Sequence, residues 1–257
     1  MKSPLPYIGG KSKLAKTIID MIPKHEAYCE VFAGAAWVFF QKEPSKYETI
    51  NDLDSDLITF YRVLQNHLEE FIKQFKWLLV SREWFEDWKR QIEAGGLTDI
   101  QRAARYYYLQ RGAFGGKVKG RIFGSNPLRH PKINLLRLEE ELSAVHLRLA
   151  RVTIENLPWR RFVERFDRPQ TFFYLDPPYW KAPVYRHNME LEDYREMAEV
   201  LGRIKGRFIW SINDQPKIRE IVKDFKFKPI KLTYSAGAAS NTVPANELLV
   251  SNFVNRR

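Results

Sequence analysis

The residues best placed to do chemistry are Asp176, Pro177, Pro178 and Tyr179, which directly follow the apolar run 171–175. That run is short, aromatic and β-branched, which predicts a buried strand with the tetrapeptide at its C-terminal end, where open α/β sheets bind ligands. Each proline keeps the residue before it extended and has no N–H to donate. The resulting rigid cluster of hydrogen-bond acceptors suits a planar group that donates two hydrogens from one nitrogen. A stiffened turn with a solvated Asp176 and a packing Tyr179 is the alternative.

Charge and cysteine content narrow the class of protein. The 257 residues include 42 Lys and Arg against 31 Asp and Glu, a formal net charge of +11, which favours a polyanionic partner. The length fits one domain with an insertion or two small domains. The one cysteine, Cys29, excludes an intramolecular disulfide framework, and its place in an apolar strand-like run predicts an inert, buried thiol. The five histidines show no metal-ligand spacing, so no metal site is expected.

Targeting and membrane signals are not found in the sequence. No apolar run approaches the roughly 18–20 residues that span a bilayer, and the N-terminus has no signal-peptide pattern. We therefore expect a cytoplasmic protein with no membrane partner, and no obligate protein partner is evident.

Strand and helix patterns alternate along both flanks of the chain, which predicts an α/β fold with a mostly parallel, helix-covered sheet. The helical patterns lie at 13–22, 57–68 and 197–201. The predicted strands are 28–32, 47–50, 152–157, 171–175 and 207–212, and 227–234 with 248–253 are expected to form a closing antiparallel pair. Segment 62–147 breaks the alternation with Trp-rich helices and a glycine-broken stretch. We therefore predict a catalytic domain of residues 1–61 and 148–257 with an inserted, mainly helical recognition region of residues 62–147.

A basic run of one sign lies in this inserted region. Between Arg102 and Arg137 there are nine Lys and Arg residues, interleaved with Tyr and Phe, and no acidic residue. A segment that contacts phosphates and stacks aromatic rings on bases is expected to have this composition. The alternative is a basic surface that is only solvated. The candidate residues for contact with nucleic acid are Arg111, Lys117, Lys119, Arg121, Asn126 and Arg129.

Further patterns stand in a fixed order along the chain: Tyr7-Ile8-Gly9-Gly10-Lys11, Glu30-Val31-Phe32-Ala33-Gly34-Ala35-Ala36, Asn51-Asp52 after a predicted strand, and segments 208–214 and 247–252. Together with residues 176–179, this ordered set resembles the Dam-type family of N6-adenine DNA methyltransferases. The first pattern resembles the family's aromatic-x-Gly-Gly-Lys signature, the second its cofactor motif Glu-Pro-Phe-x-Gly-x-Gly, and residues 176–179 its catalytic motif. Val31 and Ala36 depart from the cofactor motif. Ala36 replaces a glycine of the motif. Alanine fits this position if its φ is negative, and with a positive φ we expect weaker cofactor binding.

The resemblance implies a Rossmann-like methyltransferase sheet that binds S-adenosylmethionine at its C-terminal edge. Gly34 would let the backbone approach the cofactor, and Asp52 would accept hydrogen bonds from the ribose hydroxyls. Tyr7 and Lys11 would close over the amino-acid end, with Lys11 also available to the substrate strand. The implied cofactor-binding residues are Tyr7, Lys11, Phe32, Gly34, Asp52 and Asp176. For Asp52 the alternative role is a helix N-cap, and for the Gly-Gly-Lys turn it is an ordinary start of a helix.

The same resemblance implies site-specific methylation of N6 of an adenine in double-stranded DNA, which must first be flipped out of the duplex. Tyr179 would stack on the flipped base, and Asp176 and the Pro177 carbonyl would accept hydrogen bonds from N6, with Pro178 keeping the motif rigid. Two fixed acceptors stabilise the positive charge that grows on the attacking nitrogen. An N4-cytosine or RNA methyltransferase of the same fold and a catalytically silent DNA-binding module are the alternatives. A ribosome-associated basic protein fits the charge but explains none of the motifs.

Overall fold

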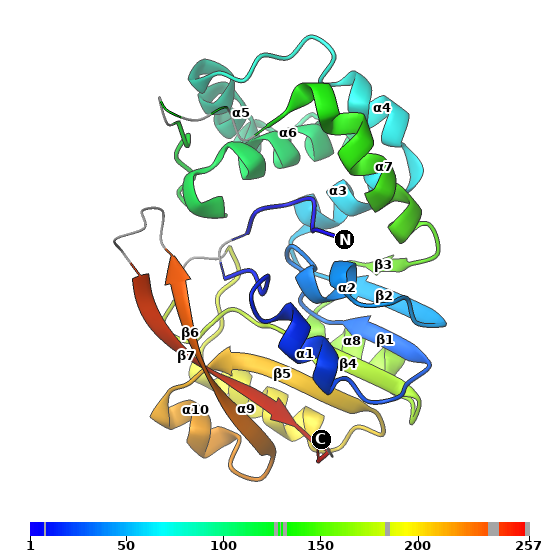
Figure 1. The fold of residues 1–257 in the computed structure, drawn as a ribbon, viewed down its shortest axis with the longest axis vertical. Helices are drawn as coiled ribbons and strands as arrows, with labels where there is room; N and C mark the ends of the chain where they lie inside the picture. The colour runs from blue at the N-terminus through cyan, green and yellow to red at the C-terminus, as the bar shows by residue number, and fades with distance from the viewer. Residues whose placement is uncertain are drawn as a thin grey trace.

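The computed structural model describes residues 1–7, 9–125, 128, 130, 133–182, 186–235 and 242–254. The described residues form a seven-stranded sheet in the order β3-β2-β1-β4-β5-β7-β6 (Figure 1). Its strands are β1 (Ala27–Glu30), β2 (Tyr47–Asn51), β3 (Thr153–Glu155), β4 (Thr171–Leu175), β5 (Arg207–Asn213), β6 (Lys226–Ser235) and β7 (Thr242–Ser251). Strands β1 to β5 are parallel, and β7 is antiparallel to both β5 and β6. The predicted α/β class with a closing antiparallel pair is therefore confirmed.

Helices cover both faces of this sheet. On one face lie α1 (Ala15–Met21), α2 (Trp37–Gln41) and α3 (Ser55–Asn66), and on the other α8 (Trp159–Phe166), α9 (Leu191–Leu201) and α10 (Pro216–Ile221). A further group at the top of Figure 1 comprises α4 (Leu68–Lys73), α5 (Arg82–Ala94), α6 (Asp99–Gly112) and α7 (Leu138–Leu149), with short 3₁₀ turns at Phe114–Gly116 and Leu135–Arg137. No helix in the described part of the chain has the length and apolar character needed to cross a membrane.

The central strand β4 sends alternate side chains to the two faces. Phe172 and Tyr174 join the buried cluster that includes α1 and α2, whereas Phe173 and Leu175 join the cluster with α8 and α9. Burial of the whole strand is expected for a parallel strand covered on both sides. Cys29 of β1 is buried, as expected, and burial raises the pKa of its thiol to about 12, which disfavours the reactive thiolate.

The helical group α4 to α7 shares one core with the sheet. Phe71, Tyr107 and Leu142 from this group belong to the same buried cluster as Tyr28 of β1 and Ile50 of β2. The predicted boundary after residue 61 lies inside α3, a continuous helix that contacts both α6 and α7. The division into two domains stays a prediction, but a cut at that boundary would divide one helix and one core.

Candidate active site

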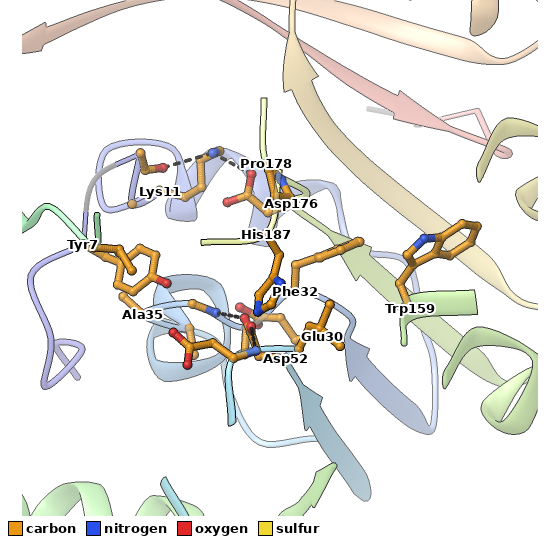
Figure 2. Close-up of a pocket in the computed structure, with 18 of the residues that line it drawn as sticks. Tyr7, Lys11, Glu30, Phe32, Ala35, Asp52, Trp159, Asp176, Pro178 and His187 are labelled. Atoms are coloured by element: carbon orange, nitrogen blue, oxygen red, sulfur yellow. Dashed lines mark hydrogen bonds and ion pairs between the residues drawn. The ribbon is translucent and has the colours of Figure 1, made fainter. Parts of the chain in front are cut away.

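A cavity of about 290 Å³ lies at the C-terminal ends of β1, β2 and β4 (Figure 2). Its lining includes residues that directly follow these strands as well as residues from the N-terminal segment. All the residues that the resemblance assigned to the cofactor are among those that line it: Tyr7, Lys11, Phe32, Gly34, Asp52 and Asp176. Asp176 therefore faces a cavity, and the alternative of a solvated turn at this position is wrong.

Asn51 joins the ends of neighbouring strands and thereby fixes the residue after it. Its Nδ2 donates to the Val31 carbonyl at 2.9 Å and to the Leu157 carbonyl at 3.0 Å. Its Oδ1 accepts from the Leu157 N–H at 2.8 Å. The side chain is buried, so these bonds satisfy an amide that would be costly to leave without partners. These bonds hold together the ends of β1 and β2 and the segment after β3, and they place Asp52 at the cavity wall.

Two backbone N–H groups orient the Asp52 carboxylate. Oδ2 accepts from Gly34 at 2.9 Å, and Oδ1 accepts from Asp54 at 2.9 Å. Burial raises the pKa of Asp52 to about 6, even though both hydrogen bonds act to lower it. The N-cap of α3 is Asp54, whose side chain accepts from the Asp56 N–H. The alternative role of Asp52 as that N-cap is therefore wrong.

The turn between β1 and α2 contains two residues in the left-handed region. Gly34 has φ +47° and Ala36 has φ +51°. A Cβ at Gly34 would lie 3.3 Å from the Tyr7 ring, so this position needs glycine for its backbone and for the close contact. Ala36 thus does not meet the condition of a negative φ under which alanine fits this position, and its N–H donates to the Ala33 carbonyl at 2.6 Å to close the turn just before α2 begins. Alanine rarely adopts this conformation.

Lys11 and Asp176 form an ion pair at one end of the cavity, while Asp52 lies toward the other (Figure 2). Lys11 Nζ lies 2.7 Å from Asp176 Oδ1 and 4.6 Å from the centroid of the Tyr179 ring. The Lys11 side chain is only 3% exposed. Burial raises the pKa of Asp176 to about 6, and the nearby ammonium opposes that rise. The ammonium thus makes the two contacts that were predicted for the substrate amine and its ring.

A second buried carboxylate lies beside this pair. Glu247 of β7 is fully buried, with Oε1 3.9 Å from Lys11 Nζ. Its Oε2 accepts from the Ser211 hydroxyl of β5 at 3.0 Å. We assigned no role to Glu247 from the sequence. The available signal was a charged residue directly before the apolar segment 248–250 of a buried strand.

The other residues of the tetrapeptide have separate positions. Pro178 is among the described residues that line the cavity, whereas Pro177 and Tyr179 are not. The Pro178 carbonyl accepts from the Tyr194 hydroxyl at 2.5 Å, which fixes the motif to α9. Because Pro177 is buried and does not line the cavity, the acceptor role of its carbonyl toward the substrate stays a prediction.

Further lining residues have no role assigned from the sequence: Glu30 begins the cofactor motif without a role of its own, and His187 and Met189 come from a segment without a motif. Glu30 at the end of β1 accepts from the Tyr28 hydroxyl at 2.6 Å, and burial raises its pKa to about 8. His187 and Met189 line the cavity from the segment after the tetrapeptide. This segment is tied to α3 by Arg186, whose Nη1 lies 3.2 Å from Asp56 Oδ2.

The candidate nucleic-acid contacts separate into exposed and buried side chains. Lys117 and Lys119 are exposed. Arg121 is only 4% exposed, and its Nη2 donates to Gln110 Oε1 at 2.9 Å. Contact of phosphate with Arg121 would need this buried guanidinium to move, so its contact with nucleic acid stays a prediction. Arg111 is half-buried, with its Nη2 3.5 Å from Glu141 Oε2.

Ion pairs with other elements also reduce the free charge of the basic run. Arg102 and Arg105 both pair with Asp56 of α3, at 2.9 and 3.2 Å. Arg137 pairs with Glu140 at 2.8 Å. Although the run contains no acidic residue, its partners come from α3, from α7 and from the first turn of α6, where Asp99 lies 3.2 Å from Arg102. The remaining candidates, Asn126 and Arg129, lie outside the described residues.

Comparison with known proteins gives matches along nearly the whole chain. The family model described as "D12 class N6 adenine-specific DNA methyltransferase" matches residues 7–236. The chain is 28% identical to the type II methyltransferase M1.LlaDCHI of Lactococcus lactis subsp. cremoris, over 97% of this chain and 94% of that protein. It is 22% identical to the DNA N-6-adenine-methyltransferase of Escherichia phage P1, over 94% of this chain but 34% of that protein. The DNA adenine methylase of Escherichia coli strain K12 is 27% identical over 47% of this chain and 44% of that protein.

Proposed function

The chain belongs to the D12 class N6 adenine-specific DNA methyltransferases, and we propose that Asp176 and Tyr179 receive the target adenine at the end of the cavity. The observation that carries this proposal is the position of the Asp176 carboxylate. This carboxylate lies in the cavity wall on a proline-stiffened segment. Lys11 Nζ contacts both the carboxylate and the aromatic ring of Tyr179, so the two groups lie near each other.

The adenine amine needs help from the protein because its nitrogen lone pair is delocalised into the ring. Asp176 accepts a hydrogen bond from N6 and stabilises the positive charge that develops there during attack, which is electrostatic catalysis by a group fixed in advance. The base cannot reach this carboxylate from within a duplex, so it must be extruded. Tyr179 offers its ring face to the extruded base.

The residues around the cavity fit S-adenosylmethionine, which supplies an electrophilic methyl group when bound. The fit rests on the Asp52 carboxylate, which two N–H groups hold at the wall, where it can accept from ribose hydroxyls. Phe32 and Met189 offer apolar surface on the same cavity. Tyr7, which packs against Gly34, is available to the amino-acid end.

Double-stranded DNA is the proposed partner, bound through the segment that carries Lys117 and Lys119. The two lysines lie between Phe114 and Ile122, whose backbone atoms pair at 2.8 Å and whose side chains are half or more exposed. Positive side chains beside exposed apolar ones suit contact with phosphates and bases.

Methyl transfer to DNA from a host without methylation tests the proposal. Wild-type protein should yield N6-methyladenine on nucleoside analysis, and Asp176→Asn should reduce turnover by about 100-fold or more, the loss typical of removing one fixed charge-stabilising group. Binding of S-adenosylhomocysteine should persist. The matched control is Asp20→Asn, which removes an exposed carboxylate 3.1 Å from Lys16 and should leave turnover unchanged. Turnover of Asp176→Asn within twofold of wild type would refute the role of Asp176, and N4-methylcytosine as product would refute the choice of base.

A further inference from the structure

The buried ion pair at the end of the cavity raises a problem for the proposed reaction. Lys11 Nζ lies 2.7 Å from the same Asp176 carboxylate, and 4.6 Å from the same Tyr179 ring, that the extruded adenine needs. A base that stacks on this face of the Tyr179 ring must therefore displace the ammonium. A charge-assisted hydrogen bond is stronger than one from a neutral amine, so the exchange is unfavourable unless Lys11 gains another partner.

The surroundings of Lys11 contain such a partner. Its Nζ donates to the Gly9 carbonyl at 3.1 Å, a contact that does not compensate the charge. Glu247 Oε1 is 3.9 Å away, so a shift of about 1 Å would give a charge-assisted bond of ordinary length. Lys11 and Glu247 are both buried, so a displaced ammonium needs an anionic partner close by.

The two oxygens of Glu247 have different partners. Oε2 accepts from the Ser211 hydroxyl at 3.0 Å, across the β5–β7 pairing, and Oε1 lies 3.9 Å from Lys11 Nζ. This hydrogen bond comes from the neighbouring strand of a rigid sheet. The position of the carboxylate is therefore set before any ligand binds.

From these contacts we infer that Glu247 is a positioning residue, which retains Lys11 when the target amine displaces it from Asp176. The inference rests on the proposed function. Glu247 does not touch the reacting atoms. It acts through Lys11 by giving the displaced ammonium a second anionic partner about 1 Å farther away.

Steady-state kinetics of Glu247→Gln, which keeps the shape and removes the charge, provide the test. We expect kcat/KM for DNA to fall about tenfold or more, while the Kd for S-adenosylhomocysteine and the unfolding temperature stay close to wild type. The acid limb of the pH profile should also move to lower pH, because Glu247 raises the pKa of Asp176. A purely structural role would not move that limb.

The matched control is Glu48→Gln, which removes another buried carboxylate, 2.6 Å from the buried Lys42. It should lower the unfolding temperature without moving the acid limb. If Glu247→Gln does not fold, Ser211→Ala decides, since it removes the hydrogen bond that orients Glu247 and keeps every charge. An unchanged kcat/KM in the folded variant, or a fall matched by weaker S-adenosylhomocysteine binding, overturns the inference. Wild-type protein without any methylation would instead overturn the proposed function.

Discussion

Replacement of Ala36 by glycine tests whether the turn before α2 is strained. Among the described residues other than glycine, only Ala36 and Lys181 have a positive φ. A left-handed conformation costs an L-residue about 1–2 kcal/mol, which glycine would recover. Against this, glycine loses about 0.5–1 kcal/mol more backbone entropy on folding, and the lost buried methyl costs about 0.8 kcal/mol. These three contributions nearly cancel, so Ala36→Gly should change the free energy of unfolding by no more than about 0.8 kcal/mol in either direction.

The neighbouring Ala35 provides a matched control. It is also buried, at 3% exposure against 1% for Ala36, but its φ is not positive. Ala35→Gly therefore loses the same entropy and methyl contributions with no recovered strain, and should destabilise the protein by about 1.3–1.8 kcal/mol. The two variants should differ by about 1–2 kcal/mol, which is about 2–8 °C in unfolding temperature for a protein of this size.

Thermal unfolding of the two variants, followed by circular dichroism or calorimetry, measures this difference. Because both substitutions delete the same atoms from adjacent buried positions, their difference isolates the backbone conformation. Equal losses of stability in the two variants would show that Ala36 carries no strain, and would refute the reasoning. S-adenosylhomocysteine titration of the same proteins reports whether the turn limits cofactor affinity.

Two further predictions concern charge. The value of kcat/KM should rise about tenfold per pH unit up to about pH 6 and then level off, because burial raises the pKa of Asp176 to about 6. Below that pH the protonated carboxyl lacks the negative charge that stabilises the positive charge growing on N6. A limb near the usual aspartate pKa in the pH–rate profile would contradict this. Replacing Lys117 and Lys119 together by alanine should reduce the slope of log Kd for DNA against log salt by about 1.8, at about 0.9 per lost phosphate contact. Arg137→Ala, which removes an arginine paired with Glu140, should leave that slope unchanged, and a slope that both variants reduce equally would refute the assignment.

The sheet and the position of Asp176 could be predicted because they depend on local patterns. The apolar run 171–175 matches β4 to the residue, since complete burial demands continuous apolar residues. Local patterns do not predict the start of β7. It includes Pro244 and Asn246, which pair with β6 although neither residue type favours a strand. Local propensity fails where pairing with a neighbouring strand decides.

Contacts between distant segments could not be predicted. The cluster of Lys11, Asp176 and Glu247 joins three parts of the chain, and no spacing in the sequence relates them. The same limit applies to the basic run, whose Arg105 is paired with Asp56 from another helix. The sequence shows which charged residues are present, but the ion-pair partner of each one is determined by the folded structure.

The common core of the sheet and the helical group limits how the predicted recognition region, residues 62–147, can be exchanged between relatives. Tyr107 of α6 and Leu142 of α7 pack in one cluster with Ile50 of β2. A chimera that exchanged residues 62–147 for those of a relative would need compensating changes in the sheet and in both halves of α3. If the segment of Lys117 and Lys119 contacts DNA as proposed, new specificity is more accessible through solvent-facing substitutions, such as those around Phe114 and Ile122, than through transplanting the whole segment.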